Sequence, residues 1–158
     1  MNEKKPYAHI LRKADIAAKQ STFRHPWNPK SEISSTWMGR LAGLSRTGVN
    51  LGRLASGKES FVYHRHHMEE EWLYILSGRG IAHIDGQDYE LGAGDFVAFP
   101  TPSVAHQLAN PFSEDLLYLM GGENRKEDIA DYPTLDRRMV RLGREIAIYK
   151  LSDGKPFF

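Results

Sequence analysis

The sequence predicts a single all-β domain, a barrel or sandwich of short strands that follows a loop-rich N-terminal arm. From about residue 37 onward, short runs of apolar and β-branched residues alternate with Gly, Asp-Gly and Pro breaks. This texture is typical of many short antiparallel strands and argues against an alternation of helices and strands. A chain of 158 residues suits one domain, because it can bury a core of its own.

The arm is expected over residues 1–40. Residues 1–20 are polar, and their weak apolar pattern allows one short strand or helical turn. Residues 21–36 contain two prolines and many hydroxyl side chains, which is typical of a loop. We expect this arm to pack on the barrel or on a partner subunit, with Trp27 as its anchor.

The barrel domain is expected over residues 41–158, ending in an edge segment. The predicted strands are 48–55, 59–65, 71–77, 80–85, 87–92, 95–99, 104–110 and 115–121. Asp85-Gly86 separates two alternating runs and indicates a tight hairpin turn. A short helix is expected near 125–130, and the apolar run 146–149 predicts an edge strand.

Composition excludes several classes of function. Lys and Arg number 21 and Asp and Glu number 20, so nothing indicates a nucleic-acid partner or an anionic membrane. The basic cluster is interleaved with acidic residues and is interpreted as a solvated face; it comprises Arg137, Arg138, Arg141 and Arg144. No stretch approaches the roughly 18 apolar residues of a membrane span, and no secretory signal opens the chain. We therefore expect a cytoplasmic protein.

The chain has no cysteine, so any metal site must use histidine and carboxylate ligands. His64 and His66 are two positions apart on a predicted strand, which puts both side chains on one face, about 6.6 Å apart. That separation lets two imidazoles converge on one ion. His67 points the opposite way and is excluded from the ligands.

Three glutamates follow the histidines. Glu69 and Glu70 are interpreted as a solvated face, but Glu71 begins the next apolar segment. A carboxylate at the head of a strand that enters a core is destabilising unless it is paired or bound to a cation. His106 lies far along the chain on another predicted strand. Three imidazoles with one carboxylate suit Mn, Fe, Co, Ni, Cu or Zn rather than Ca or Mg.

Two blocks of this sequence resemble the paired motifs of the cupin superfamily. The first motif is written G-x5-H-x-H-x3,4-E-x6-G. Here six residues separate Gly57 from His64-Arg65-His66, four more lead to Glu71, and six more lead to Gly78. Gly57 is therefore one residue early.

The second motif is written G-x5-P-x-G-x2-H-x3-N. The segment 94–100 matches its beginning, and His106 with Asn110 matches its end. The chain between Pro100 and His106 is one residue longer than the pattern, with Pro102 near the expected glycine. This departure bears on the turn that leads into His106.

The resemblance implies a double-stranded β-helix, the cupin or jelly-roll barrel, with two antiparallel sheets facing each other. It carries the ligand positions over to His64, His66, Glu71 and His106. These would hold one divalent transition metal ion (Zn, Mn, Fe or Ni) in the mouth of the barrel. The whole sequence also resembles uncharacterised bacterial single-domain cupins.

Several functions stay open at this point. The resemblance favours a metal-dependent enzyme acting on a small-molecule substrate, with a sugar or sugar-phosphate isomerase as the first candidate. The alternatives are a dioxygenase or other metal-dependent cupin enzyme, and a non-catalytic cupin that binds a small ligand or carbohydrate. The arm shows no helix-turn-helix pair, so direct gene regulation is not expected.

Two further expectations concern single elements. His83 is a candidate acid or base, because histidine titrates near neutrality; the competing interpretation is a histidine at the surface or rim. The segment 72–76 is apolar on both of its faces. One face can fill the barrel, and the other predicts a homodimer, because it needs cover.

Overall fold

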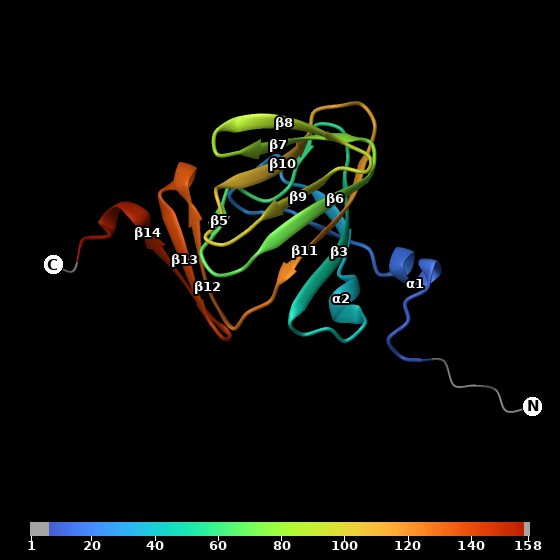
Figure 1. Ribbon diagram of the computed structural model, residues 1–158, viewed down its shortest axis with the longest axis horizontal. Helices are drawn as coiled ribbons and strands as arrows, with labels where there is room; N and C mark the ends of the chain where they lie inside the picture. The colour runs from blue at the N-terminus through green and yellow to red at the C-terminus, as the bar shows by residue number, and fades with distance from the viewer. Residues whose placement is uncertain (1–6, 157–158) are drawn as a thin grey trace, which may run out of the picture.

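The computed structural model describes residues 7–156 and shows a protein built almost entirely of antiparallel strands (Figure 1). Its helical elements are short: α1 (Lys13–Ala18), α2 (Met38–Leu41), η1 (Pro133–Leu135) and η2 (Leu151–Asp153). Its strands are β1 (Ser21–Phe23), β2 (Ile33–Thr36), β3 (Thr47–Leu54), β4 (Lys58–Glu59), β5 (Arg65–His66), β6 (Glu71–Ser77), β7 (Arg79–Ile84), β8 (Gln87–Gly92), β9 (Phe96–Phe99), β10 (His106–Asn110), β11 (Leu116–Glu123), β12 (Glu127–Tyr132), β13 (Arg137–Leu142) and β14 (Glu145–Lys150). The predicted all-β class is confirmed.

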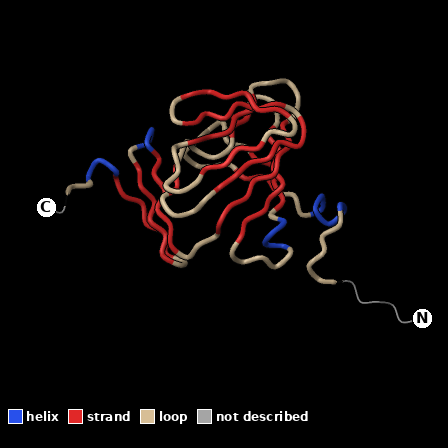
Figure 2. Tube along the Cα trace, viewed as in Figure 1, coloured by secondary structure: helices blue, strands red, loops and turns tan. Residues whose placement is uncertain are grey.

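Two sheets enclose the core. One has the strand order β1-β2-β3-β11-β6-β9 and the other has the order β4-β10-β7-β8. The buried cluster takes Leu54, Ile75 and Tyr118 from the first sheet and Ala82 and Leu108 from the second. Because inward side chains of both sheets meet in one cluster, the expected barrel of two facing antiparallel sheets is present (Figure 2).

A third sheet follows the barrel at its C-terminal side, with the order β14-β13-β12-β5 (Figure 1). Its last strand, β5, carries His66, so this sheet reaches directly to the histidine cluster. The strand expected at 146–149 is β14, and it does lie at the sheet edge. Its partner β13 was not predicted.

The hairpin between β7 and β8 forms where Asp85-Gly86 predicts it. Ile84 pairs with Gln87 across a two-residue turn, and Asp85 and Gly86 have φ values of 49° and 78°. Two consecutive positive φ angles define the turn type that matches the twist of the flanking strands.

Three sequence predictions of secondary structure are wrong. The segment 125–130 is not a helix, because residues 127–132 form β12 and pair with both β13 and β5. The segment 21–36 is not simply a loop, since it supplies β1 and β2 to the edge of the six-stranded sheet. The segment 59–65 is not continuous strand; only β4 and β5 remain at its two ends. In the first two cases pairing with distant strands overrides local propensity.

The arm meets the C-terminal sheet through Trp27. Its ring lies edge-on to Tyr132 at 5.2 Å between centroids, and the Arg137 guanidinium lies 4.2 Å above it. Within residues 7–156, none of the helices has the length and apolar character needed to cross a membrane.

Candidate metal centre

Four side chains far apart in the sequence meet at one end of the barrel. His64 and His66 flank the start of β5, Glu71 begins β6, and His106 begins β10. The backbones of His64 and His106 are joined directly, with the amide of each donating to the carbonyl oxygen of the other at 3.1 and 2.7 Å. These two hydrogen bonds hold the segments of the two predicted motifs side by side.

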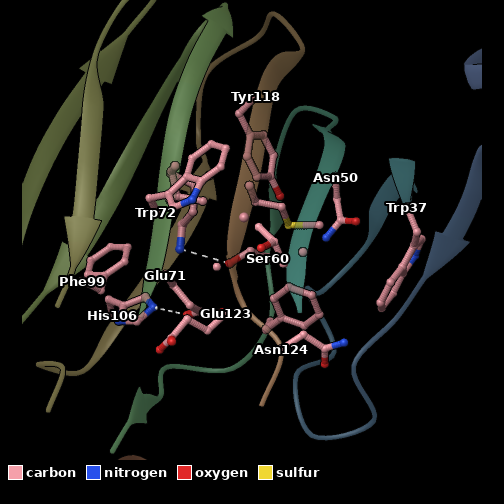
Figure 3. A pocket seen from close by; sticks show the side chains of 18 of the residues that line it. Trp37, Asn50, Ser60, Glu71, Trp72, Phe99, His106, Tyr118, Glu123 and Asn124 are labelled. Carbon is pink, nitrogen blue, oxygen red and sulfur yellow. Dashed lines mark hydrogen bonds and ion pairs between the residues drawn. The ribbon is translucent and has the colours of Figure 1, made fainter. Parts of the chain in front are cut away.

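The three imidazoles point their Nε2 atoms at one carboxylate oxygen. The Oε2 atom of Glu71 lies 3.0 Å from Nε2 of His106, 3.5 Å from that of His66 and 3.6 Å from that of His64. Figure 3 shows Glu71 and His106 facing each other. The structure therefore brings together all four residues expected to be ligands.

The opposite ring nitrogens are all held by acceptors. Nδ1 of His64 lies 2.7 Å from the Val62 carbonyl oxygen, and Nδ1 of His106 lies 3.0 Å from that of Val104. A carbonyl oxygen only accepts, so each Nδ1 must carry its proton and donate. Each Nε2 is then left with a free lone pair directed at the centre, which is the tautomer a metal needs.

This donor set fits a cation. Lone pairs of neutral imidazoles and a carboxylate repel one another unless a positive charge lies between them. Burial alone would raise the pKa of Glu71, but its contacts with His106 and His64 hold that pKa well below its ordinary value. Glu71 is thus ionised at neutral pH, and the four groups suit one divalent transition metal ion.

Asp128 is a member of the site that the sequence analysis missed. It lies on β12, is 1% exposed, and its Oδ2 accepts the Nδ1 proton of His66 at 2.6 Å. Its other oxygen accepts the Met68 amide at 3.3 Å. Although burial opposes it, the hydrogen bond to Asp128 together with the negative charges nearby raises the pKa of His66. Asp128 was missed because a helix was expected near 125–130. If residues 127–132 are treated as a strand instead, alternation makes Asp128 a candidate for the inward face.

His67 turns away from the centre, as predicted, and so does its neighbour Arg65. Both bind Asp131, which is fully buried, at 2.9 Å for Arg65 Nη2 and 2.8 Å for His67 Nε2. Arg138 reaches the same carboxylate, with its Nε atom at 2.6 Å. This ion cluster holds β5, and hence His66, against β12 and β13 within the C-terminal sheet.

The expectation of a solvated face is wrong for Glu69. Glu69 is buried, and its Oε1 lies 2.5 Å from Nη2 of Arg141 and accepts the Arg125 amide. Arg138 and Arg141 likewise make ion pairs, so their interpretation as merely solvated residues is also wrong. Glu70 is exposed, as expected.

Hydrogen bonds at Ser103 hold the loop that precedes His106, which is one residue longer than the second motif. The His66 amide donates to Ser103 Oγ at 2.8 Å, and the Ser103 amide donates to the His66 carbonyl oxygen at 2.8 Å. The His106 ring also stacks on Phe99, with 3.5 Å between centroids and 6° between planes. The loop accommodates the extra residue, and the His106 ring still points toward the Glu71 carboxylate.

His83 is not brought to this centre. Its partner across the sheet is Gln107, whereas the next pair, Ile84 with His106, faces the core. Because neighbours alternate between faces, His83 points out of the barrel, is 42% exposed, and pairs with Asp88 at 2.6 Å. The expectation that His83 acts as acid or base beside the metal is therefore not supported.

A cavity of about 540 Å³ opens from the ligands into the barrel. His64, Glu71 and His106 line it, with apolar walls that include Phe99. Figure 3 shows further polar side chains around the same space; they include Asn50, Ser60, Tyr118, Glu123 and Asn124.

Comparison with known proteins agrees with this architecture. The family model for the cupin domain matches residues 50–121. A crystal structure of a proposed sugar phosphate isomerase from Acidithiobacillus ferrooxidans is 32% identical, with a TM-score of 0.91 over 96% of this chain and 97% of that one. A sugar phosphate isomerase of the cupin superfamily from Silicibacter pomeroyi is 27% identical, with a TM-score of 0.76 over 88% of this chain and 89% of that one.

Among curated proteins, similarity is shorter. An oxalate-binding protein from Thermotoga maritima is 39% identical over 56 residues, which span 35% of this chain and 46% of that protein. The matched segment thus covers less than half of that relative's length. The match of motif, barrel and near-complete chain establishes the family: this chain belongs to the cupin superfamily.

Proposed function

We propose that His64, His66, Glu71 and His106 hold one divalent transition metal ion: Zn, Mn, Fe or Ni. The observation that carries this proposal is the convergence of three Nε2 atoms on Glu71 Oε2 at 3.0–3.6 Å, each with its Nδ1 proton already engaged. Four protein ligands leave one or two positions free for water or substrate oxygens.

We further propose that the protein is a metal-dependent enzyme acting on a small molecule, with a sugar or sugar phosphate isomerase as the first candidate. Two structures described as such isomerases resemble this chain over most of its length, which supports this choice. When bound, the ion would supply a Lewis acid for a substrate carbonyl.

An isomerase also needs a group that moves a proton between adjacent carbons. The carboxylates that line the cavity are Glu71 and Glu123. Since Glu71 is committed to the imidazoles, we assign the proton transfer to Glu123, at the end of β11. Its Oε2 accepts the Glu70 amide at 3.3 Å, which fixes it beside the ligands (Figure 3).

A non-catalytic ligand-binding cupin is the second candidate, because the matched segment of the oxalate-binding relative supports it. An isomerase would convert its substrate, whereas a binding protein would bind its ligand without converting it. A dioxygenase would be distinguished from both because it consumes oxygen.

The decisive experiment is elemental analysis of the purified protein, followed by assays with aldose and ketose phosphates after the bound metal is restored. We expect one transition metal per chain, and interconversion that is lost in His106→Ala while the circular dichroism spectrum is kept. No stoichiometric metal after reconstitution would overturn the metal site. Bound metal without turnover on any substrate would favour the binding protein.

We also propose a homodimer. The outer face of β6 and the edge strand β9 expose Tyr74, Leu76 and Phe96, and Phe96 is 61% exposed. A second copy would cover this apolar face. Light scattering on a sizing column should give about twice the mass of 18.0 kDa, and Phe96→Lys should return the monomer mass.

A further inference from the structure

Arg40 brings a positive charge to the wall of the cavity. Among the described residues that line this cavity it is the one arginine, and none of them is a lysine. Within residues 7–156, no carboxylate forms an ion pair with its guanidinium, whereas other arginines, such as Arg53 and Arg79, are paired with acids. The donors of Arg40 are therefore free to bind an anionic ligand.

Close packing of α2 against β3 holds Arg40 beside the barrel. A Cβ atom at Gly39 would lie 3.0 Å from the Val49 amide nitrogen, so the helix and the strand are in direct backbone contact. The loop that follows α2 is tied to the end of β11, because Asn124 Nδ2 donates to the Ser45 carbonyl oxygen at 2.7 Å. These contacts fix the segment that carries Arg40 relative to the cavity.

The cavity has an exposed end and a buried end. Trp37 and Leu44 line it and are exposed, whereas His106 is buried. Figure 3 shows Trp37 across the space from His106. Arg40 is exposed and follows Trp37 by three residues, which brings the two to one face of a helical turn. The arginine charge is therefore at the exposed end of the cavity, and the proposed metal ligands are at the buried end.

The acid nearest to this end of the cavity already has partners of its own. Glu123 lines the cavity and would repel an anion, but its Oε1 lies 3.6 Å from Nη1 of Arg125 and its Oε2 accepts the Glu70 amide. Its charge is partly compensated, whereas that of Arg40 is not. Ser45 also lines the cavity, and its hydroxyl can donate to the same anion.

We propose that Arg40, with Ser45, binds a terminal phosphate group of the substrate and is the residue that selects phosphorylated substrates over unphosphorylated ones. A guanidinium matches phosphate because it donates two parallel hydrogen bonds. This inference rests on the proposed function and names its substrate class: a polyhydroxylated chain with its carbonyl end at the proposed metal ligands and its phosphate at Arg40. The cavity of about 540 Å³ is in the range of sites that hold molecules of this size.

The test compares two acids by titration calorimetry on the metal-loaded protein. D-gluconate and its terminal phosphate ester both carry a carboxylate for the metal and a chain of hydroxyls, and they differ only in the phosphate at the far end. Arg40→Gln removes the charge and keeps a flexible polar side chain. Arg144→Gln is the matched control, because Arg144 is also exposed but lies in the turn between β13 and β14, outside the cavity lining.

We expect the wild type to bind the phosphate ester about 10- to 100-fold more tightly than D-gluconate, because a charge-assisted contact adds affinity of this order. Arg40→Gln should lose most of this preference, while unchanged binding of D-gluconate shows that the variant is folded. Arg144→Gln should keep the preference. Added salt should reduce the preference of the wild type, since an exposed ionic contact is screened.

Equal affinities of the wild type for the two acids would overturn the phosphate subsite, and so would failure of both acids to bind. A preference that survives in Arg40→Gln, or that is lost equally in Arg144→Gln, would also overturn it. When the metal is removed, both acids should bind more weakly but the preference should persist, because Arg40 is not a proposed ligand. A wild type with this preference but without isomerase turnover would contradict the proposed function and leave the subsite standing.

Discussion

The Nδ1 atom of His66 lies 2.6 Å from Oδ2 of Asp128, and this contact ties one proposed metal ligand to the C-terminal sheet. Asp128 fixes both the tautomer and the direction of the His66 ring, so that Nε2 faces Glu71. A carboxylate behind a ligating histidine also makes that ring a better donor. The C-terminal sheet thus supplies the proposed ligand His66 on β5 and, through Asp128 on β12, the group that orients its ring.

Asp128→Asn should weaken metal binding by about 10- to 100-fold, as measured by competition with a chromophoric chelator. Asp88→Asn is the matched control, because Asp88 also contacts a histidine Nδ1, that of His83, at 2.6 Å, but on the outside of the barrel. Metal affinity should be unchanged in the control. Equal weakening in both variants would mean that Asp128 has no specific role in holding His66.

The buried Asp131 should make stability depend on acid pH. Burial alone would raise its pKa, but hydrogen bonds from Arg138 and His67, with one from Arg65, hold the pKa of Asp131 far below its ordinary value. A lowered folded-state pKa adds stability that is complete above the unfolded value of about 3.9, and that is lost as the pH falls toward the folded value.

Asp131→Asn should therefore lower the free energy of unfolding at pH 7 by about 2–3 kcal/mol, allowing for the partial exposure of its arginine partners. Urea denaturation should show this difference shrinking below about pH 4. The exposed pair of Arg53 and Asp115 provides the control, since Asp115→Asn should change stability by less than about 1 kcal/mol. A loss of stability in Asp131→Asn that stays constant down to pH 2 would exclude an ionic origin.

Glu123→Gln should lower kcat by about 100-fold or more, because a general base typically contributes this much. Metal content should stay that of the wild type, since Glu123 is not among the proposed ligands. Assay of the reconstituted variant with the substrate found in the screen, beside metal analysis of the same sample, checks both points. Unchanged kcat would remove Glu123 from the mechanism.

The part of the site that sequence could predict is the part set by local spacing. His64 and His66 share a strand face, and Glu71 heads the next strand; these relations follow from alternation over a few residues. The assignment of His106 as a ligand, in contrast, depends on the resemblance of its segment to the second cupin motif.

What sequence could not supply is register between distant strands. Asp128 contacts His66 only because β12 pairs with β5. The four consecutive charged residues at 125–128 had instead suggested a helix. The outward direction of His83 depends on its pairing with Gln107. Which of three consecutive glutamates is buried beside Arg141 likewise depends on the fold of the C-terminal sheet.

Gly122 sets how closely β11 approaches the proposed ligand Glu71. A Cβ atom at Gly122 would collide with the Glu70 carbonyl oxygen and lie 3.2 Å from the Glu71 Cα and Cγ atoms. Gly122→Ala should therefore push the head of β6 aside and lower the free energy of unfolding by about 1–3 kcal/mol. Metal affinity should fall with it, because the Glu71 carboxylate moves away from the imidazoles.

Gly48 offers a matched control, since it is the cross-strand partner of Gly122 on β3. A Cβ atom at Gly48 would find its nearest neighbours at 3.8 and 4.0 Å, an ordinary contact distance, so Gly48→Ala should leave metal affinity unchanged. Chelator competition and urea denaturation on both variants measure the two effects. If Gly122→Ala bound metal as tightly as Gly48→Ala, the close approach of β11 would not be what positions Glu71.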